Sequence, residues 1–353
     1  MAINPEMIVL ARESRGWTQR ELAAELGVSQ ATWSKYELGM LRIPDEIIAH
    51  VATKLDYEPG FFEQTQTLVG LAGDFLYRKR AHVAAKIRRR VQAEVNIRRM
   101  QIERLMRRAD IVRDDLPFPA IQPEEMDGRI DRIAQEVRKI WRIPQGPIRN
   151  VTAHIENAGA IIFAVDFETD LIDGTNVRRP GEPPMLFVNS KVPGDRHRFN
   201  LAHELAHSVM HFGTAFDDAE YQANQFAAEF LMPRTVIRSD LRNLDLAGAA
   251  QLKIVWGVSM AAIIMRAHDI GAITESVYRR LFTALNARGM RTREPLEVPF
   301  EEPMVFDALV KVHRDSFQMD DSQLRKVLFT DRLGPRPLSA TPLPMRITPT
   351  LFN

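Results

Sequence analysis

A histidine motif inside an apolar segment is the feature that most constrains how this chain can fold. Residues 203–207 read His-Glu-Leu-Ala-His, and apolar side chains recur at helical spacing on both sides of them. On a helix, His203 and His207 lie one turn apart on the same face, roughly 6 Å along the axis. Because unpaired polar groups are costly to bury, these side chains need a shared partner inside the domain.

The residue types of this motif fit a metal centre. Zinc accepts neutral imidazole nitrogen at roughly 2.0–2.1 Å, and a glutamate beside the ligands can take a proton from a metal-bound water. His203 and His207 are therefore predicted zinc ligands, and Glu204 is the predicted general base of a hydrolase. The alternative is a chance match to a five-residue pattern, which the apolar helical context disfavours.

A third zinc ligand must come from elsewhere, because a catalytic zinc normally has three protein ligands and an open position for water. His211 continues the one-turn spacing, but it lies roughly 12 Å from His203 along a regular helix, so the two cannot share one ion. We expect His211 to have a structural or ligand-supporting role. The next predicted helix, residues 216–231, offers four acidic candidates: Asp217, Asp218, Glu220 and Glu229. Spacing alone does not choose among them.

The composition limits the other classes of function. A chain of 353 residues is long enough for two or three domains with a sizeable core. It contains no cysteine, which excludes disulfides and thiol catalysis and leaves histidine and carboxylate as zinc ligands. No stretch approaches the apolar length of a membrane span, and the N-terminus lacks the pattern of a secretory signal. We therefore expect a cytoplasmic protein with no membrane partner.

The N-terminal region predicts two short helices joined by a tight turn. Thr18 and Glu21 have the spacing of a capping box, Gly27 turns the chain, and Ser29 can cap the next helix. Trp33 on that second helix is interpreted as a core residue. This order of signals is typical of a helix-turn-helix.

Residues 18–39, TQRELAAELGVSQATWSKYELG, closely resemble the XRE family of phage-repressor-like DNA-binding domains, and the likeness runs from Met7 to about Phe62. The resemblance implies double-stranded DNA as a partner and a homodimer on a pseudo-palindromic site. It places Gln19 at the phosphate backbone. It places four residues on the face that enters the major groove: Gln30, Ala31, Thr32 and Lys35. A protein-docking module is the alternative.

A strongly basic stretch follows, from residue 78 to residue 113. It has no proline or glycine, and its apolar residues recur at three- and four-residue steps, so a long amphipathic helix is predicted. The basic face either extends the contact with DNA phosphates or is solvated while the apolar stripe packs on another domain or subunit. We favour packing first, and Val91 and Val95 in the stripe are the candidate dimer contact.

The remainder of the chain predicts a small sheet among helices. The expected helices are 126–141, about 148–158, 247–266 and 274–288. The expected strands are 160–165 and 185–188, with a loop from 174 to 184 between them. The end of the chain, with its proline-rich residues 334–349, is expected to be a small peripheral unit with an irregular tail.

The histidine motif and the acidic helix after it together resemble a second family. RHRFNLAHELAHSVMH followed by EYQANQFAAEFLMP looks like the ImmA/IrrE family of metallopeptidases, a minimal gluzincin-like fold, from about Asp127 to Leu241. In that family the glutamate four residues before the asparagine of the second motif is the third ligand, and this position is Glu220. The resemblance implies that Glu220 completes the zinc site and that Glu204 is the base and then the proton donor to the leaving amine.

Other polar residues near the motif are candidates for binding substrate. His197 and Tyr221 are candidates for stabilising the tetrahedral oxyanion. Arg196 and Arg198 are candidates for binding a substrate carboxylate, although an exposed structural role is the simpler interpretation.

The predicted fold class is mainly α with a small α+β part. The expected order is an all-α helix-turn-helix domain, a long connecting helix, a minimal gluzincin-like metallopeptidase domain with a small sheet, and a helical C-terminal part. The expected boundaries are 1–70, 71–120, 121–241, 242–303 and, for the peripheral unit, 304–353.

The two resemblances together predict a transcriptional regulator with a zinc-dependent endopeptidase domain. Its expected substrate is a repressor or antitoxin-like DNA-binding protein, because members of the peptidase family are associated with cleavage of helix-turn-helix repressors. Three alternatives stay open. They are a catalytically silent domain that senses a ligand or metal, a regulator that cleaves itself between its two domains, and an enzyme whose N-terminal domain only docks substrate.

Overall fold

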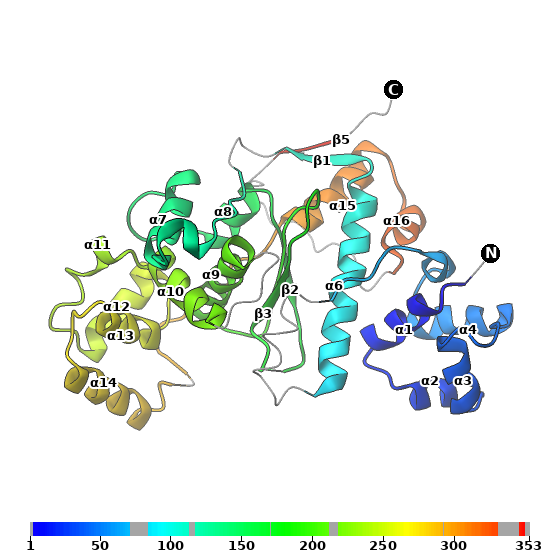
Figure 1. Cartoon of the computed structure of the whole chain (residues 1–353), viewed down its shortest axis with the longest axis horizontal. Coiled ribbons are helices and arrows are strands. Elements are labelled where there is room, and N and C mark those ends of the chain that lie inside the picture. The colour runs from blue at the N-terminus through cyan, green and yellow to red at the C-terminus, as the bar shows by residue number, and fades with distance from the viewer. Residues whose placement is uncertain are drawn as a thin grey trace. The chain divides into compact units, whose positions relative to one another are not determined.

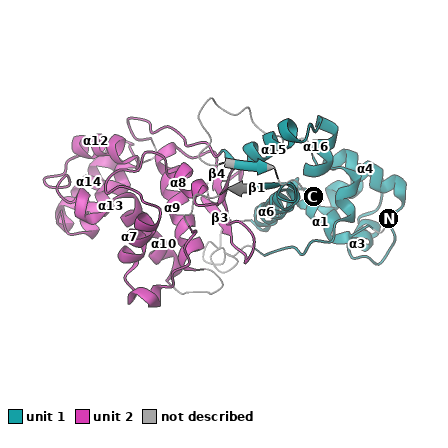
Figure 2. Ribbon diagram, turned by 90° about the horizontal axis from the view of Figure 1, so that it is seen from above, with its two compact units in different colours: residues 1–112, 304–353 teal, residues 113–303 magenta. Residues whose placement is uncertain are grey.

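The computed structural model describes residues 3–70, 84–112, 117–169, 171–211, 218–291, 293–330 and 346–349. The chain forms two compact units (Figures 1 and 2). Unit 1 contains residues 1–112 and 304–353, and unit 2 contains residues 113–303. The predicted mainly helical class with a small sheet is confirmed. The five-part division expected from the sequence is finer than these two units and stays a prediction.

Unit 1 is built from helices and one two-stranded sheet. Its described elements are α1 (Pro5–Ser14), α2 (Gln19–Glu25), α3 (Gln30–Glu37), α4 (Asp45–Leu55), the 3-10 helix η1 (Pro59–Glu63), α6 (Ala85–Leu105), β1 (Ala109–Val112), α15 (Val305–Ser316), α16 (Asp321–Leu328) and β5 (Arg346–Pro349).

The turn between α2 and α3 forms as its sequence signals predict. The Thr18 hydroxyl accepts a hydrogen bond from the Glu21 amide at 3.2 Å, and the Glu21 carboxylate accepts one from the Thr18 amide at 2.6 Å. Gly27 adopts a φ of +67°, which favours glycine because it has no Cβ. The Ser29 hydroxyl then accepts from the Thr32 amide at 3.1 Å. The predicted helix-turn-helix is confirmed.

Aromatic residues make the centre of unit 1. Trp33 is completely buried, which confirms its interpretation as a core residue. The Tyr57 ring stacks on Phe61 with the ring centres 4.5 Å apart, and Phe329 meets Phe61 edge-on at 5.3 Å. The segment that follows α16 therefore contributes to the same core as the N-terminal helices.

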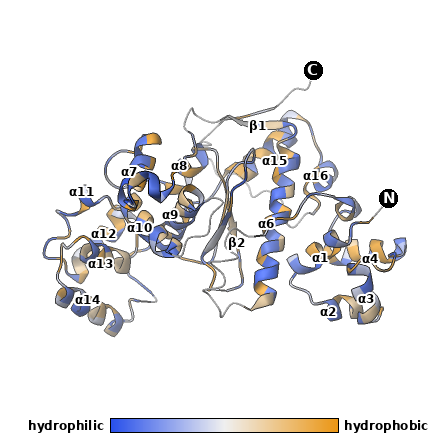
Figure 3. Ribbon diagram, in the orientation of Figure 1, coloured by the Kyte–Doolittle hydropathy of each residue, from blue (hydrophilic) through white to orange (hydrophobic). Residues whose placement is uncertain are grey.

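The basic stretch is helical over a shorter range than predicted. α6 ends at Leu105, and residues 109–112 form β1, which pairs antiparallel with β5. Residues 71–83, which include the predicted start of this helix, lie outside the described part of the chain. Hydrophilic colour dominates α6 in Figure 3, with hydrophobic positions between.

Part of the expected peripheral unit packs on α6. The Gln101 side chain donates a hydrogen bond to the Leu328 carbonyl at 2.6 Å, and Arg104 donates to the Val327 carbonyl at 3.0 Å. Residues 346–349 were expected to be irregular, and they form β5 because β1 supplies a pairing partner. The tail from 331 to 345 lies outside the described residues.

Unit 2 contains a three-stranded sheet among helices. Its described elements are the 3-10 helix η2 (Pro123–Met126), α7 (Ile130–Ile140), α8 (Val151–Asn157), β2 (Ile161–Val165), β3 (Gly174–Val177), β4 (Met185–Asn189), α9 (Gly194–Met210), α10 (Ala219–Leu231), α11 (Arg234–Ile237), α12 (Leu246–Trp256), α13 (Met260–Asp269) and α14 (Glu275–Ala287).

The sheet of unit 2 has one strand more than the sequence predicted. Its order is β2-β4-β3, with β2 parallel and β3 antiparallel to the central strand β4. All residues of β4 are buried. Residues 174–177 were expected in a loop, and they form β3 because β4 offers them an open edge.

A break at Gly257 divides the helix that was expected over residues 247–266. Gly257 has a φ of +65° and ends α12, and the Ser259 hydroxyl accepts from the Ala262 amide to begin α13. No single described helix is long and apolar enough to cross a membrane. Only α12 and α13 taken together have the length and apolar composition of a membrane span among the described helices, and the two are bent by 102° at the break between them.

A segment from Glu294 to Glu301, called the strap below, crosses the start of α9. A Cβ atom on Gly194 would collide with the backbone carbonyls of Val298 and Pro299, so this close approach requires glycine. The Glu294 carboxylate accepts from the buried Lys253 at 3.0 Å, and Glu301 pairs with the buried Arg198. The strap therefore supplies a carboxylate to each of two buried cations of unit 2, and Lys253 has Asp195 of α9 as a second partner at 2.6 Å.

Candidate metal centre and nucleic-acid interface

Three side chains from neighbouring helices converge in unit 2. The Nε2 atoms of His203 and His207 on α9 lie 3.0 Å apart. The Glu220 carboxylate on α10 lies 3.6 Å from His203 Nε2 and 3.4 Å from His207 Nε2. All three ligand atoms lie within 4.8 Å of one another. The structure thus brings together the three residues that were predicted to hold zinc.

The other acidic candidates do not join this group. Glu229 is buried and pairs with Arg266, and it also accepts from the Gln135 amide at 2.8 Å. Asp218 is exposed at the N-terminus of α10, and Asp217 lies outside the described residues. Glu220 is the candidate whose position on α10 faces the two histidines.

A side chain of α10 orients the first histidine. His203 Nδ1 lies 3.0 Å from Asn224 Oδ1. An amide oxygen only accepts hydrogen bonds, so Nδ1 carries the ring proton and Nε2 keeps its lone pair. Asn224 follows Glu220 by one helical turn, so one helix supplies both the acidic group and the residue that sets the His203 tautomer.

A second chain of hydrogen bonds orients His207. His211 Nε2 lies 2.9 Å from Gln222 Oε1, and His211 Nδ1 lies 2.8 Å from His207 Nδ1. Burial lowers the pKa of His211 to about 4, so its ring is neutral near pH 7. The amide oxygen takes the His211 proton at Nε2, so His211 Nδ1 accepts from His207 Nδ1. His207 Nε2 therefore keeps its lone pair.

These arrangements point three acceptor atoms at one place, which is what a cation requires. Imidazole nitrogen and carboxylate oxygen are zinc donors, and hydrogen-bonded Nδ1 atoms are usual behind zinc-bound histidines. Two nitrogens on one tetrahedral zinc lie about 3.3 Å apart. The observed 3.0 Å between the Nε2 atoms is close to that spacing, so the residues present fit the ion.

Glu204 on α9 is held by residues of the sheet. Its carboxylate is buried and accepts a hydrogen bond from Asn176 of β3 at 2.9 Å. The Asn176 oxygen in turn accepts from the Ser208 hydroxyl at 3.2 Å. A Cβ on Gly174 would lie 2.8 Å from Glu204 Cγ and 2.9 Å from its Oε1, so glycine at this position makes room for the carboxylate. The strand that the sequence did not predict thus positions the predicted base.

The two oxyanion candidates lie in different surroundings. His197 is completely buried, with its Nε2 3.4 Å from the Thr152 hydroxyl and its ring centre 4.0 Å from that of Phe300. Burial lowers the pKa of His197 to about 4. Tyr221 is 65% exposed on α10, and its hydroxyl accepts from Gln225. These contacts make His197 a core residue and leave Tyr221 on the surface.

The two arginine candidates also differ. Arg196 pairs with Asp173 at 2.6 Å and is partly exposed, as expected for a surface residue. Arg198 is buried and donates to the Ile148 carbonyl as well as to Glu301. The expectation of an exposed role was wrong for Arg198, because the strap brings a carboxylate to it.

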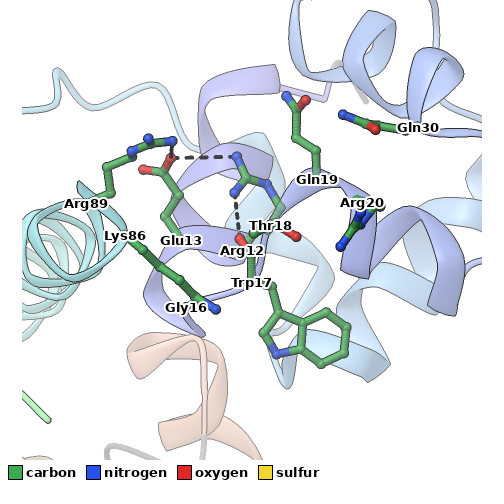
Figure 4. A pocket seen from close by; sticks show the side chains of 10 residues that line it. All are labelled: Arg12, Glu13, Gly16, Trp17, Thr18, Gln19, Arg20, Gln30, Lys86 and Arg89. Carbon is green, nitrogen blue, oxygen red and sulfur yellow. Dashed lines mark hydrogen bonds and ion pairs between the residues drawn. The ribbon is translucent and has the colours of Figure 1, made fainter. Parts of the chain in front are cut away.

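The predicted DNA-reading residues gather on the outer side of unit 1. Gln30, Ala31 and Lys35 of α3 are exposed, and Thr32 is partly covered because its hydroxyl lies 2.9 Å from that of Ser29. Gln19 at the start of α2 lines the same cavity as Gln30 (Figure 4). The turn between the two helices brings these residues together.

Glu37 fixes this surface from inside the domain. Its carboxylate accepts from Arg12 Nε at 2.5 Å, from the Trp33 indole at 2.7 Å and from the Gln19 amide at 2.8 Å. Arg12 also donates to the Trp17 carbonyl at 2.7 Å. A buried ion pair therefore holds the side-chain amide of Gln19 in place.

Comparison with protein families now places both regions. Residues 8–62 match the helix-turn-helix model, and residues 155–268 match the model of the IrrE N-terminal-like domain, a peptidase family. The chain joins these two domains. No curated protein matches it. The IrrE-like match contains His203, His207, Glu204 and Glu220, and the helix-turn-helix match contains all the predicted DNA contacts.

The two matches support a coarse functional statement. The helix-turn-helix domain suggests a DNA-binding regulator, and the IrrE-like domain suggests a protease-like domain. Sequence reasoning missed two polar residues of the second domain. Asn176 is on a strand without apolar alternation, and Gln222 is an ordinary polar position on α10, so neither had a local signal.

Proposed function

We propose that this chain is a transcriptional regulator with a zinc-dependent endopeptidase domain. The observation that carries the proposal is the convergence of His203, His207 and Glu220 inside the IrrE-like domain. Zinc bound there would supply a Lewis acid and lower the pKa of a bound water. The tautomers set by Asn224 and Gln222 support this assignment, because they turn both Nε2 lone pairs towards one point.

Glu204 is the general base in this proposal. It follows the ligand His203 directly on α9, and Asn176 fixes one of its carboxylate oxygens. The other oxygen takes a proton from the attacking water and passes it to the leaving amine. Because the carboxylate is buried, it needs this hydrogen bond to remain oriented between the two transfers.

The substrate in this proposal is a repressor or antitoxin-like protein with a helix-turn-helix. The N-terminal domain binds double-stranded DNA, with Gln19 at the backbone and α3 in the major groove. We also propose a cytoplasmic homodimer. Val91 and Val95 are 2% and 1% exposed within the single chain, so they are not available for the dimer contact that the sequence had favoured.

Metal analysis tests the site. Wild type purified with zinc is expected to hold one ion, and His203→Ala and Glu220→Ala are expected to lose most of it because each removes a ligand. Asp218→Ala is the matched control, since it removes an exposed carboxylate of the same helix terminus. Full zinc retention by Glu220→Ala would overturn the assignment of the third ligand.

Catalysis needs a separate test. Glu204→Gln should keep zinc and lose hydrolysis of a helix-turn-helix repressor added in trans, because the amide does not accept the proton. Incubating wild type and Glu204→Gln with zinc and without an added repressor distinguishes self-cleavage from cleavage in trans. Fragments formed only by the wild type would establish self-cleavage, whereas identical intact bands would leave cleavage in trans. Equal hydrolysis of an added repressor by both proteins would contradict the role of Glu204.

A further inference from the structure

The arginines in the second half of α6 are used in packing. Arg99 donates to the Thr67 carbonyl at 2.9 Å, and the Arg104 guanidinium lies over the Phe329 ring at 4.5 Å. The Arg98 guanidinium lies over Phe306 at 4.9 Å. This half of the basic helix therefore packs against other parts of unit 1, in agreement with the prediction that the basic stretch serves packing first.

The first turns of α6 are different. The side chains of Lys86 and Arg89 are 56% and 60% exposed, and each has only a long contact with a carboxylate among the ion pairs of the described chain. These contacts are 3.9 Å between Lys86 and Glu21 and 3.8 Å between Arg89 and Glu13. Each pair is long and its cation is exposed to solvent, so both contribute little to stability. Packing does not account for these two cations.

Both cations line a cavity beside the helix-turn-helix. The cavity has a volume of about 550 Å³ and also borders Gln19, Arg20 and Gln30 (Figure 4). Gly16 also borders the cavity, and its backbone passes close to the Lys86 side chain of α6. Residues of α1, α2, α3 and α6 thus surround one hollow.

The lining of this cavity matches a phosphate group. The lining has four cationic side chains against the single carboxylate of Glu13, and Gln19 is already the predicted backbone contact. The cations are Arg12, Arg20, Lys86 and Arg89. Lysine and arginine bind phosphate oxygens by charge-assisted hydrogen bonds. Because Gln19 and Gln30 line the same cavity, its cations lie on the face that is proposed to meet DNA.

We propose that this cavity binds a backbone phosphate of double-stranded DNA, so that Lys86 and Arg89 of α6 extend the DNA contact beyond the helix-turn-helix. The inference rests on the proposed DNA-binding function. It assigns part of the affinity to residues outside the matched range 8–62. This part is independent of base sequence, because phosphates carry no sequence information.

Glu21 competes with the phosphate in this arrangement. Its carboxylate lies 3.9 Å from Lys86 Nζ and also closes the capping box with Thr18. Glutamine closes a capping box as glutamate does. Glu21→Gln therefore removes the negative charge beside Lys86 and keeps the start of α2 intact, which gives a variant expected to bind DNA more tightly.

The test measures the affinity of the full chain for a mixed-sequence duplex about three helical turns long, by fluorescence anisotropy over a range of salt concentrations. Lys86→Gln and Arg89→Gln should each weaken binding and reduce the slope of log K against log salt by about 1. Glu21→Gln should strengthen binding. Lys139→Gln, which removes an exposed charge from α7, is the matched control.

The outcomes separate this inference from the function on which it rests. Slopes for Lys86→Gln and Arg89→Gln equal to that of Lys139→Gln would overturn the inference and leave DNA binding standing. Failure of the wild type to bind any duplex at low salt would overturn the DNA-binding function and this inference with it. Saturable binding of inorganic phosphate, measured by calorimetry and lost in Arg89→Gln while DNA binding is unchanged, would assign the cavity to a free anion instead.

Discussion

The helix-turn-helix and the metal centre both use a polar side chain of a neighbouring helix to fix a functional group, but they use different kinds of side chain. In unit 1 the buried carboxylate of Glu37 holds Gln19 while it pairs with Arg12. In unit 2 the neutral amides of Gln222 and Asn224 hold the histidines, and neither amide is buried. In unit 1 the side chain that positions Gln19 is also part of a buried ion pair that stabilises the fold. In unit 2 the amides that position the histidines can be removed without exposing a buried charge.

The difference follows from the cost of leaving a partner behind. Removing the Glu37 charge leaves the buried Arg12 guanidinium with only the more distant Glu13 carboxylate, 3.6 Å away, and a poorly compensated buried charge is expensive. Removing the Gln222 amide leaves a neutral imidazole that water can reach. Substitutions in the two regions should therefore separate loss of the fold from loss of ligand binding.

The largest expected effect is in unit 1. Glu37→Gln should destabilise this unit by at most about 3–5 kcal/mol, because the buried Arg12 stays charged and loses the nearer of its two carboxylate partners. Hydrogen exchange of the α3 amides measures the loss. Glu25→Gln is the control, since it removes one partner of the exposed pair with Lys54 and should cost about 1 kcal/mol or less. Equal losses in the two variants would break the comparison.

The next effect is an acid sensitivity of unit 2. His197 has a folded pKa of about 4 against about 6.5 when unfolded, so folding excludes its proton. Its contribution to stability is present above pH 6.5 and is lost as the pH falls towards 4, by about 3 kcal/mol. Denaturant unfolding of metal-free protein should show His197→Phe losing less stability than wild type over this range. Parallel pH curves for the two proteins would refute the assignment.

The exposed His50 of unit 1 supplies a control for the same experiment. His50→Gln removes an exposed histidine from the other unit, so the pH dependence of denaturant unfolding should stay as in the wild type. A change of that dependence in His50→Gln would show that the acid response does not belong to unit 2.

A smaller effect tests the other half of the comparison. Gln222→Met should weaken zinc binding by roughly 10- to 100-fold, because His211 no longer holds the His207 tautomer. Competition with a chromophoric chelator measures the affinity, and thermal unfolding of the metal-free protein should be unchanged. Gln225→Met on the same helix is the control, because that side chain bonds to Tyr221. Equal affinities of the two variants would remove Gln222 from the site.

The smallest effect concerns helix caps in the two units. Thr18→Ala should cost about 1 kcal/mol, because the hydroxyl caps α2 and is half of a reciprocal pair of hydrogen bonds. Thr274→Ala in α14 should cost less, since its bond to the Val277 amide is 3.4 Å long and has no reciprocal bond. Chemical denaturation followed by helix signal checks both, and a larger loss in Thr274→Ala would reverse the order.

Local signals predicted the elements whose boundaries depend on nearby residues. Thr18, Gly27 and Ser29 defined the helix-turn-helix because capping and turn conformation act within a few residues. The same kind of local signal divides α12 from α13, because Gly257 ends the first helix and Ser259 caps the second, although the apolar spacing alone predicts one long helix.

Features that depend on contacts far apart in the sequence were not predictable in this way. β3 has a polar sequence and forms because β4 gives it a partner, and β5 forms because β1 does. The resemblance indicated Glu220, whereas Asn176 and Gln222 become visible only when β3 and α10 lie beside α9. Arg198 was misjudged for the same reason, since its carboxylate partner comes from the strap.

The strap also determines where this protein can be cut for expression. The IrrE-like match stops at residue 268, but Glu301, which pairs with Arg198, and Glu294, one of the two carboxylates that pair with Lys253, lie beyond it. A recombinant fragment ending at the edge of the match would leave Arg198 without its carboxylate partner and Lys253 with Asp195 alone. On the ribosome, α9 emerges well before the segment that closes over Gly194. The smallest soluble peptidase fragment should therefore extend past Glu301.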